Sequence, residues 1–145
     1  MDIYNHPMQK THLVILKKQY LTALLNRTKT IEARFLKYKR PPWNSVRPND
    51  TLFFKLSSGP VCAAARVEKI YACDNITPAR ISEISKQYAS RIAASPEYWQ
   101  TVKHAKFALF IWLKDVRPVK PIPINKKDRR PWVVLTPEEN FGLCQ

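Results

Sequence analysis

The sequence is poor in glycine, cysteine, histidine and acidic residues, and it contains no long apolar run. Cys62, Cys73 and Cys144 have no Cys-x-x-Cys spacing and cannot all pair, which favours a reducing compartment. Because the 3 histidines are also scattered, we expect no metal site and no cofactor. No apolar run reaches the roughly 18 residues of a membrane span, and the N-terminus lacks the apolar segment of a signal peptide. These absences predict a soluble, cytoplasmic protein without a membrane partner.

The basic residues are in large excess: 25 Lys and Arg against 11 Asp and Glu give a net charge of +14. Such an excess favours a polyanionic partner. A hydrophobic content of 45% with 4 Trp indicates a folded globule and not a disordered basic tail. The 145 residues are most simply one domain, residues 1–145, with an N-terminal arm (1–9) and a C-terminal tail (136–145).

The stretch Lys29 to Phe35 alternates polar and apolar residues, which predicts a strand. Its apolar positions, 31, 33 and 35, are expected to face a core, while Thr30, Glu32 and Arg34 share the opposite face. The pattern is also typical of an edge strand with a solvated charged face. The strand therefore carries a dense group of functional side chains, whose role depends on what faces them.

The rest of the chain predicts a small barrel around this strand. Strands are expected over 11–16, 51–56, 61–70, 107–113 and 132–135, and helices over 17–26 and from the starts Thr77-Pro78 and Ser95-Pro96. This order predicts an α+β fold with a mostly antiparallel, nearly closed β-barrel and flanking helices. One shared core is expected to contain Ile31, Phe53, Val67, Phe107, Leu109 and Ile111.

Two proline-containing segments concentrate basic residues, and the first interleaves them with Tyr38 and Trp43. Cations beside a stacking surface are a common pattern for single-stranded nucleic acid. A basic loop with Trp43 tucked into the core is the alternative. The basic residues singled out are Lys37, Lys39, Arg40, Arg47, Lys126, Lys127, Arg129 and Arg130.

The order of several motifs resembles the ASCH domain of the PUA-like superfamily. These motifs are Lys-Thr-Ile-Glu-x-Arg (Lys29 to Arg34) after a helix, Asn49 to Phe54 entering a strand, the strand Val61 to Ile70, Pro96 to Trp99, and Val116 to Pro123. Each motif is weak alone, but their order and spacing extend over nearly the whole chain. The chain has Arg27 and Asn49 where the family often has glycine.

The resemblance implies a pseudobarrel with a cleft for a nucleobase or nucleotide. Within the family some members bind RNA or DNA, some are thought to be nucleases, and small relatives hydrolyse N4-acetylcytidine. In that last group a Lys at the position of Lys29 is catalytic, with a Thr on the following strand and a Glu from a helical segment. Here Glu32 replaces the strand Thr, and the helical Glu is Glu83 or Glu97.

Three hypotheses follow for Lys29, Glu32 and Arg34. In a nucleic-acid-binding module, with RNA favoured over DNA, Lys29 and Arg34 contact a phosphate or base oxygen, Glu32 accepts from an exocyclic amine, and Trp43 or Tyr38 stacks. Such a module would be a monomer or weak oligomer holding a nucleotide or modified base.

The second hypothesis is a hydrolase, either an amidohydrolase on modified nucleosides or a ribonuclease, in which Lys29 and Glu32 are catalytic. Lys29 would act as a base, or Glu32 would keep it protonated as an electrostatic stabiliser of a developing oxyanion. In the third hypothesis Lys29, Glu32 and Arg34 form a structural ion-pair ladder, and the basic surface serves solubility or a protein partner.

Overall fold

A computed structural model of the chain describes residues 9–127 and 129–143. His6, Cys144 and residues 1–8 of the predicted arm lie outside these ranges. In chain order the elements are β1 (Thr11–Leu16), α1 (Lys18–Leu25), β2 (Ile31–Leu36), β3 (Thr51–Leu56), β4 (Val61–Cys73), α2 (Pro78–Ile92), α3 (Pro96–Thr101), β5 (Phe107–Ile122) and β6 (Trp132–Val134).

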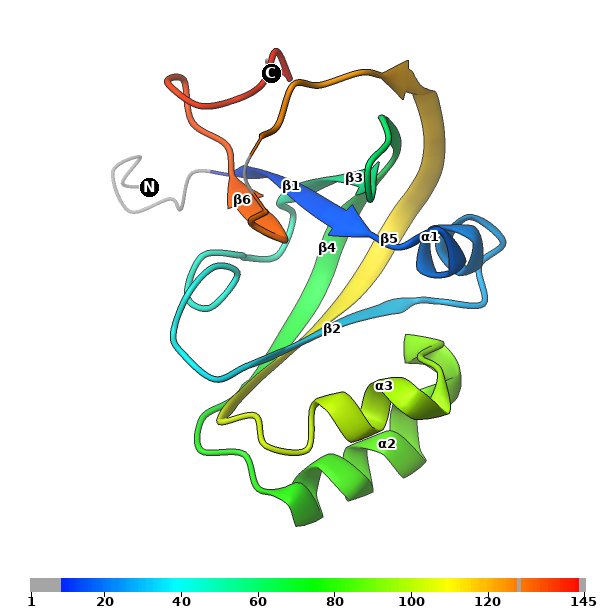
Figure 1. The fold of residues 1–145 in the computed structure, drawn as a ribbon, viewed down its shortest axis with the longest axis vertical. Coiled ribbons are helices and arrows are strands. Elements are labelled where there is room, and N and C mark those ends of the chain that lie inside the picture. Colours follow the sequence, from blue (N-terminus) through cyan, green and yellow to red (C-terminus); the bar gives the residue numbers. More distant parts are fainter. Residues whose placement is uncertain (1–8, 128, 144–145) are drawn as a thin grey trace, which may run out of the picture.

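The strands form a six-stranded sheet in the order β2-β5-β4-β3-β1-β6. Neighbouring strands are antiparallel except β1 and β3, which run parallel. The sheet curls so that β1 crosses over the long pair β4 and β5, while α2 and α3 lie together below β2 (Figure 1). This arrangement confirms the predicted α+β, mostly antiparallel, PUA-like pseudobarrel. The curl leaves β2 and β6 as the two edges of the sheet, and it brings β2 opposite the end of β1 and the segment before β6, where the site lies.

The predicted helix starts are confirmed by their capping bonds. The hydroxyl of Thr77 accepts the backbone N–H of Arg80, and the hydroxyl of Ser95 accepts that of Tyr98. Proline follows each cap at the first helical position, where its missing N–H costs no helical hydrogen bond. α1 is close to the predicted helix over 17–26, although it has no side-chain cap.

β5 is longer than the sequence predicts, because it continues from Leu113 to Ile122 through two prolines. The register of β2 against β5 ends at the pair Ile31–Trp112. Beyond that pair the backbone N–H of Leu113 still donates to the carbonyl of Thr30. From Lys114 onward β4 is the only strand paired with β5 among the described residues, so the other edge of β5 can hold residues without an N–H. The register against β4 also shifts along this part of the strand. Because prolines are rare in strands, the sequence did not predict this irregular extension of β5.

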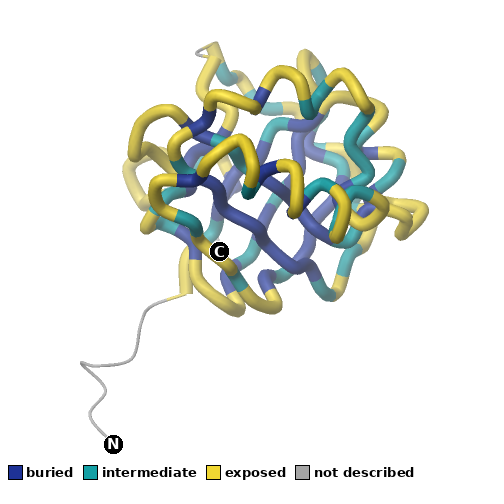
Figure 2. The backbone as a smooth tube through the Cα atoms, turned by 90° about the horizontal axis from the view of Figure 1, so that it is seen from below, coloured by how far each residue is buried: buried dark blue, intermediate teal, exposed yellow. Residues whose placement is uncertain are grey.

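The predicted single core is wrong, since the buried residues form three clusters. Val67, Leu109 and Ile111 lie inside the curled sheet, whereas Ile31 packs under the helices. Phe53 borders the third cluster, and Phe107 is half-buried against Trp43. Strand residues alternate between faces, and the register that pairs Glu32 with Ile111 places Ile31 on the other face. In Figure 2 the buried positions accordingly run through the strands, with exposed positions around them.

The polar face of β2 therefore points into the barrel and not into solvent. Glu32 shares its face with Ile111, and Arg34 shares its face with Leu109. Glu32 is 3% exposed although it lies on an edge strand. The alternating pattern correctly predicted the two faces, but the solvated-edge alternative does not apply to Glu32.

The two positions where the family often has glycine keep a glycine-like backbone. Arg27 has a φ of 68° and Asn49 a φ of 73°, which lie in the left-handed region. Asparagine adopts this region more readily than most residues, whereas arginine adopts it at a steric cost. Both turns are thus made without glycine, just before β2 and β3.

The C-terminal tail is irregular but not detached. Leu143 is buried within the third cluster, and Phe141 packs against it. The tail therefore closes the outer side of the sheet near β1. Among the described residues, no helix is long and apolar enough to cross a membrane.

Candidate functional site

A cleft of about 300 Å³ lies at the seam between β2 and the end of β1. Residues of α1, α3 and the segment before β6 complete its walls. Four residues predicted from the sequence lie in it, Lys29, Glu32, Arg34 and Arg40. Its other lining residues are Ile15, Leu16, Lys17, Tyr20, Ala33, Phe35, Leu36, Ile92, Ala94, Tyr98, Val102 and Pro131. The volume is at the lower end of the range for small-molecule sites, which suits a single base.

Lys29 is 4% exposed, and three oxygens surround its ammonium. Nζ donates to the carbonyl of Ile31 at 2.9 Å and to that of Ile92 at 2.8 Å, and it lies 3.0 Å from Oε1 of Glu32. Ile92 is the last residue of α2, so the ammonium also stands at the negative end of that helix. Since an ammonium has three donors, each of them is occupied. The site holds Lys29 as a cation.

Glu32 bridges the two cations of the ladder. Its Oε2 accepts from Nε of Arg34 at 2.8 Å and lies 2.7 Å from Nη2, while Oε1 faces Lys29. Burial alone would raise the pKa of Glu32, but the charges of Lys29 and Arg34 outweigh it and hold the pKa below its ordinary value. The predicted ion-pair ladder is therefore present, and the same ladder lines the cleft.

Arg34 crosses the seam from β2 to the opposite edge of the sheet. Its Nη2 donates to the carbonyl of Ile15 at 3.3 Å, and its Cζ lies 5.3 Å from the ring centroid of Trp132. Nη1 has no hydrogen-bond partner among the residues that the structure describes. Arg34 thus joins the two edges and keeps donors for a ligand in the cleft.

A buried polar chain supports Trp132 from behind. The indole N–H of Trp132 donates to Nδ1 of His12 at 3.0 Å, so Nε2 of His12 carries the proton and donates to Asp50 at 2.8 Å. Asp50 also accepts the backbone N–H groups of Lys10 and Arg47. Burial would raise the pKa of Asp50, but the hydrogen bonds from His12, Lys10 and Arg47 hold it below its ordinary value. These hydrogen bonds therefore fix the position of the Trp132 ring on which Arg34 packs.

Two tyrosines in the cleft were not predicted as site residues. Tyr98 comes from α3 and Tyr20 from α1, with ring centroids 6.4 Å apart. Burial, and then the negative charge of Glu32, raise the pKa of Tyr98, so its hydroxyl stays protonated at neutral pH. Tyr98 belongs to the motif Pro96 to Trp99, so the sequence held a signal for it. Nothing in the sequence indicates the carbonyl of Ile92.

We compared the sequence and the structure with known proteins to find which folds they resemble. No protein-family model matches the sequence, and no curated protein matches it either. The structure is similar to a crystal structure of ASCH from Zymomonas mobilis, with a TM-score of 0.70, 18% identity, and 90% of each chain covered. A single-residue mutant of that protein gives a TM-score of 0.71 at 19% identity, covering 92% of this chain and 94% of the other.

The chain has the ASCH fold. A likeness at these identities is one of fold, and it confirms the architecture that the motif order predicted. The N-terminal domain of McrB from Staphylothermus marinus is a more distant match, with a TM-score of 0.50 and 8% identity over 80% of this chain and 77% of that domain.

Within this ASCH fold the predicted helical carboxylates lie outside the cleft. Glu97 is exposed in the first turn of α3, and Glu83 forms an exposed ion pair with Arg80 at 2.9 Å. Thr30 also turns away, since its hydroxyl accepts from Arg91 at 3.1 Å. The carboxylate that the ASCH fold brings to the cleft is that of Glu32.

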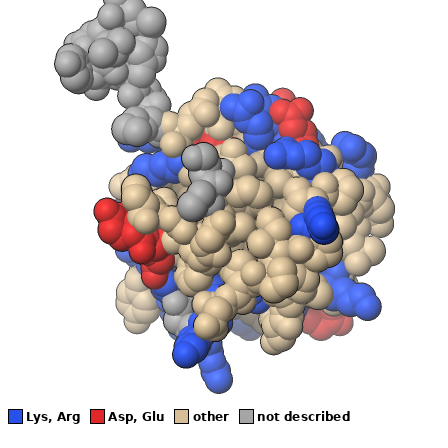
Figure 3. Space-filling view, turned by 90° about the horizontal axis from the view of Figure 1, so that it is seen from above, with Lys and Arg blue, Asp and Glu red and all other residues tan. Residues whose placement is uncertain are grey.

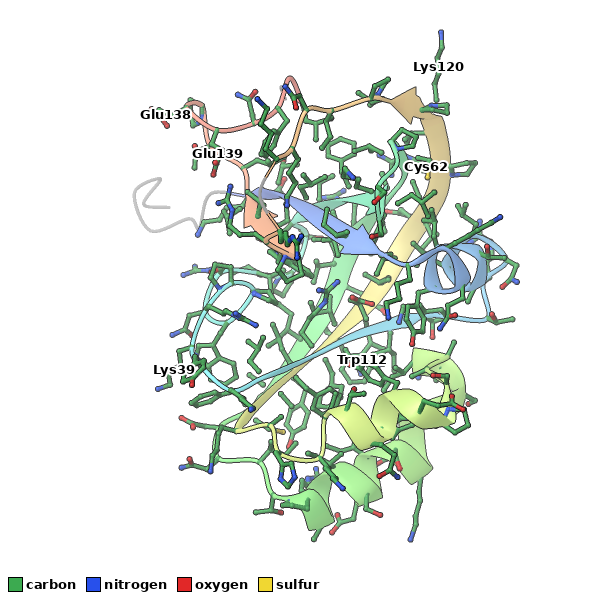
Figure 4. The ribbon with its side chains drawn as sticks, viewed as in Figure 1. Lys39, Cys62, Trp112, Lys120, Glu138 and Glu139 are labelled. Atoms are coloured by element: carbon green, nitrogen blue, oxygen red, sulfur yellow. The ribbon has the colours of Figure 1, made fainter. Side chains whose placement is uncertain are left out.

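The basic residues predicted to bind nucleic acid are divided among several surfaces of the chain. Lys39, at the left of Figure 4, lies 3.9 Å from Asp74, and the half-buried Trp43 packs on Phe107 instead of lining the cleft. On the face in Figure 3, Lys and Arg lie mainly around the rim of a largely uncharged area. Of the other predicted residues, exposed Arg47 and Lys127 and half-buried Lys126 also lie outside the cleft.

A second hollow of about 560 Å³ adjoins the cleft, because Arg40 and Pro131 line both. Arg129 and Arg130 also line it. Arg130 is paired with Glu139 at 2.8 Å. Among the described residues no group of three His, Cys, Asp or Glu side chains could hold a metal ion. In this chain the cleft that contains Lys29, Glu32 and Arg34 thus adjoins an arginine-lined surface.

Proposed function

We propose that this chain is a nucleic-acid-binding module that holds one nucleobase or modified base of a single strand in the cleft, with RNA as the preferred ligand. The observation that carries the proposal is the continuity between the cleft and the arginine-lined hollow through Arg40. The net charge of +14 and the fold shared with ASCH proteins support it. RNA is preferred because proteins read RNA sequence mainly from splayed, single-stranded bases.

The cleft offers a base both polar and apolar contacts. Arg34 presents the donors of Nη1, which suit a carbonyl oxygen or ring nitrogen of a base. The protonated hydroxyl of Tyr98 can donate or accept, and the rings of Tyr98 and Tyr20 give an apolar wall. Glu32 acts here through Arg34, since both of its oxygens already face cations.

The hollow beside the cleft offers contacts for the phosphates. Arg40 and Arg129 are exposed, and neither forms an ion pair with a described residue. Each arginine that reaches a phosphate releases counterions, which strengthens binding and makes it dependent on salt. A base in the cleft and a phosphate at Arg40 would be one nucleotide apart at most, because Arg40 lines both spaces.

The second candidate function is hydrolysis of a modified nucleoside or of RNA. The observation that favours it is the presence of Lys29, Glu32 and Tyr98 in one cleft. Lys29 would stabilise an oxyanion only by exchanging one of its three present partners, and a cation with every donor occupied cannot accept a proton. The geometry therefore supports binding more directly than catalysis.

The experiment is fluorescence anisotropy with RNA and single-stranded DNA oligomers across a salt series. We expect log affinity to fall by about 0.7 per contacted phosphate for each unit of log salt. Arg40→Ala with Arg129→Ala should weaken binding and lower this slope, whereas the control pair Lys86→Ala and Lys120→Ala should not. Absence of binding at low salt would overturn the proposal. Turnover of N4-acetylcytidine or of a labelled RNA by the wild type, lost in a Lys29→Met variant that is still folded under the assay conditions, would establish the hydrolase instead.

A further inference from the structure

A third hollow, of about 460 Å³, lies beside the start of α2 and outside the cleft. Its basic lining comes from two separate segments, Lys37 after β2 and Lys103, His104 and Lys106 before β5. Tyr38 stands at its edge with 72% of its surface exposed. Four basic or titratable nitrogen groups and an open aromatic ring thus surround one space.

The positive charge of this hollow is not neutralised. None of Lys37, Lys103 and Lys106 forms an ion pair with any of the described residues, in contrast to Lys39 and Arg130. Like charges brought together on a surface repel one another, and an anion that binds between them removes the repulsion. The hollow is therefore complementary to a phosphate.

The floor of the hollow is a fixed backbone. The N–H of Lys106 donates to the carbonyl of Leu36 at 2.9 Å, and the N–H of Ile76 donates to the carbonyl of Lys106 at 2.8 Å. These bonds hold the end of β2, the start of β5 and the segment before α2 side by side. The side chains of Ile76 and Ala105 are 7% and 9% exposed and make the floor apolar. An apolar, rigid floor with cations at its rim suits a planar ring that carries phosphate.

The hollow is adjacent to the cleft along the chain in two places. Leu36 and Val102 line the cleft, and the next residues, Lys37 and Lys103, line the hollow. In Figure 1 the loop after β2 lies between the connection from α3 to β5 below it and the segment entering β6 above it. The arginine-lined hollow borders that upper segment, so the cleft has cationic surface on two sides.

We propose that the hollow formed by Lys37, Tyr38, Lys103 and Lys106 is a second nucleotide subsite, in which Tyr38 stacks a base and the lysines bind phosphate. This inference rests on the proposed function and adds the substrate class: a single strand of several nucleotides, read at an internal base, and not a free nucleoside or a strand end. Base stacking on an exposed aromatic ring and phosphate contact by lysines together bind single strands with little sequence preference.

The test measures binding of labelled RNA of two and of eight nucleotides by fluorescence anisotropy. Lys37→Ala with Lys103→Ala should lower the salt slope for the octamer by about 1.4, two phosphate contacts at about 0.7 each. Tyr38→Ala should weaken octamer binding by about 5- to 150-fold, and Tyr38→Phe should leave it unchanged. Both changes should affect the dinucleotide much less, because it fills only the cleft.

The control pair is Lys86→Ala with Lys120→Ala, which removes the same charge from exposed positions; Lys120 projects from the distant end of β5 in Figure 4. These variants should keep the wild-type slope. If the octamer binds but the hollow variants match the control pair, the second subsite is wrong and the proposed function stands. If no oligomer binds at low salt, the proposed function fails and the subsite with it.

Discussion

Replacing Lys29 with methionine should destabilise the protein as well as change the cleft. Methionine is close to lysine in length, so little cavity is expected, but the ammonium and its three contacts are lost. Glu32, 3% exposed, then keeps only Arg34 as a partner, and the carbonyls of Ile31 and Ile92 lose a donor. Removing one partner of a buried ion pair costs about 3–5 kcal/mol, and the remaining Arg34 places the expected loss near the lower limit, about 3 kcal/mol.

The loss should depend on pH in a defined direction. The pKa of Glu32 in the folded protein is below its unfolded value, so its ionisation contributes stability that is present above the unfolded pKa of about 4.3 and is lost as pH falls through the folded pKa. Without Lys29, burial is opposed only by Arg34, and the pKa of Glu32 should rise. The difference between wild type and variant should therefore be largest near neutral pH and narrow progressively in acid.

Denaturant titration at neutral pH and at about pH 3.5 measures both quantities. The matched control is Lys86→Met, at an exposed lysine of α2 that forms no ion pair with a described residue. This change should alter the unfolding free energy by less than about 0.5 kcal/mol. A loss below about 1 kcal/mol at neutral pH would refute the assignment of Lys29 as a structural cation. A difference that does not shrink in acid would refute its coupling to Glu32.

Three further changes test other parts of the structure. Leu109→Ala, at a position 3% exposed inside the curled sheet, should cost about 2–5 kcal/mol in a denaturant titration, and a cost below about 0.5 kcal/mol would mean that β5 is not central. Asp50→Asn should cost about 1–3 kcal/mol at pH 7. Because the folded pKa of Asp50 is lowered, this cost should shrink as pH falls through that folded pKa, and a pH-independent cost would contradict the hydrogen-bond assignment. Trp132→Phe keeps a ring under Arg34 but removes the N–H bonded to His12, so thermal unfolding should show a loss of about 0.5–1.5 kcal/mol, and an unchanged transition would argue against that bond.

The local pattern of the sequence determined most of the elements. β1 and β3 have the predicted bounds, and the caps Thr77 and Ser95 start α2 and α3 as predicted. These features depend on neighbouring residues, namely alternation along a strand and a hydroxyl before a proline. The same alternation placed Glu32 and Arg34 on one face of β2, opposite Ile31.

The tertiary structure alone decided which residues surround the polar face of β2. The curl of the sheet turns the polar side of an edge strand inward, so the ladder is buried and Arg34 reaches Ile15, 19 residues away in sequence. The carbonyl of Ile92 accepts a hydrogen bond from Lys29 only because α2 ends beside β2. Every residue has a backbone carbonyl, so the residue type at position 92 could not predict this contact. The extension of β5 through its prolines was not predicted for a similar reason. A proline is tolerated in a strand only where its missing N–H would face an unpaired edge, and the pairing of the strand decides which edge that is. Long-range pairing and the curvature of the sheet, which no short stretch of sequence encodes, thus converted a charged strand into the wall of a cleft.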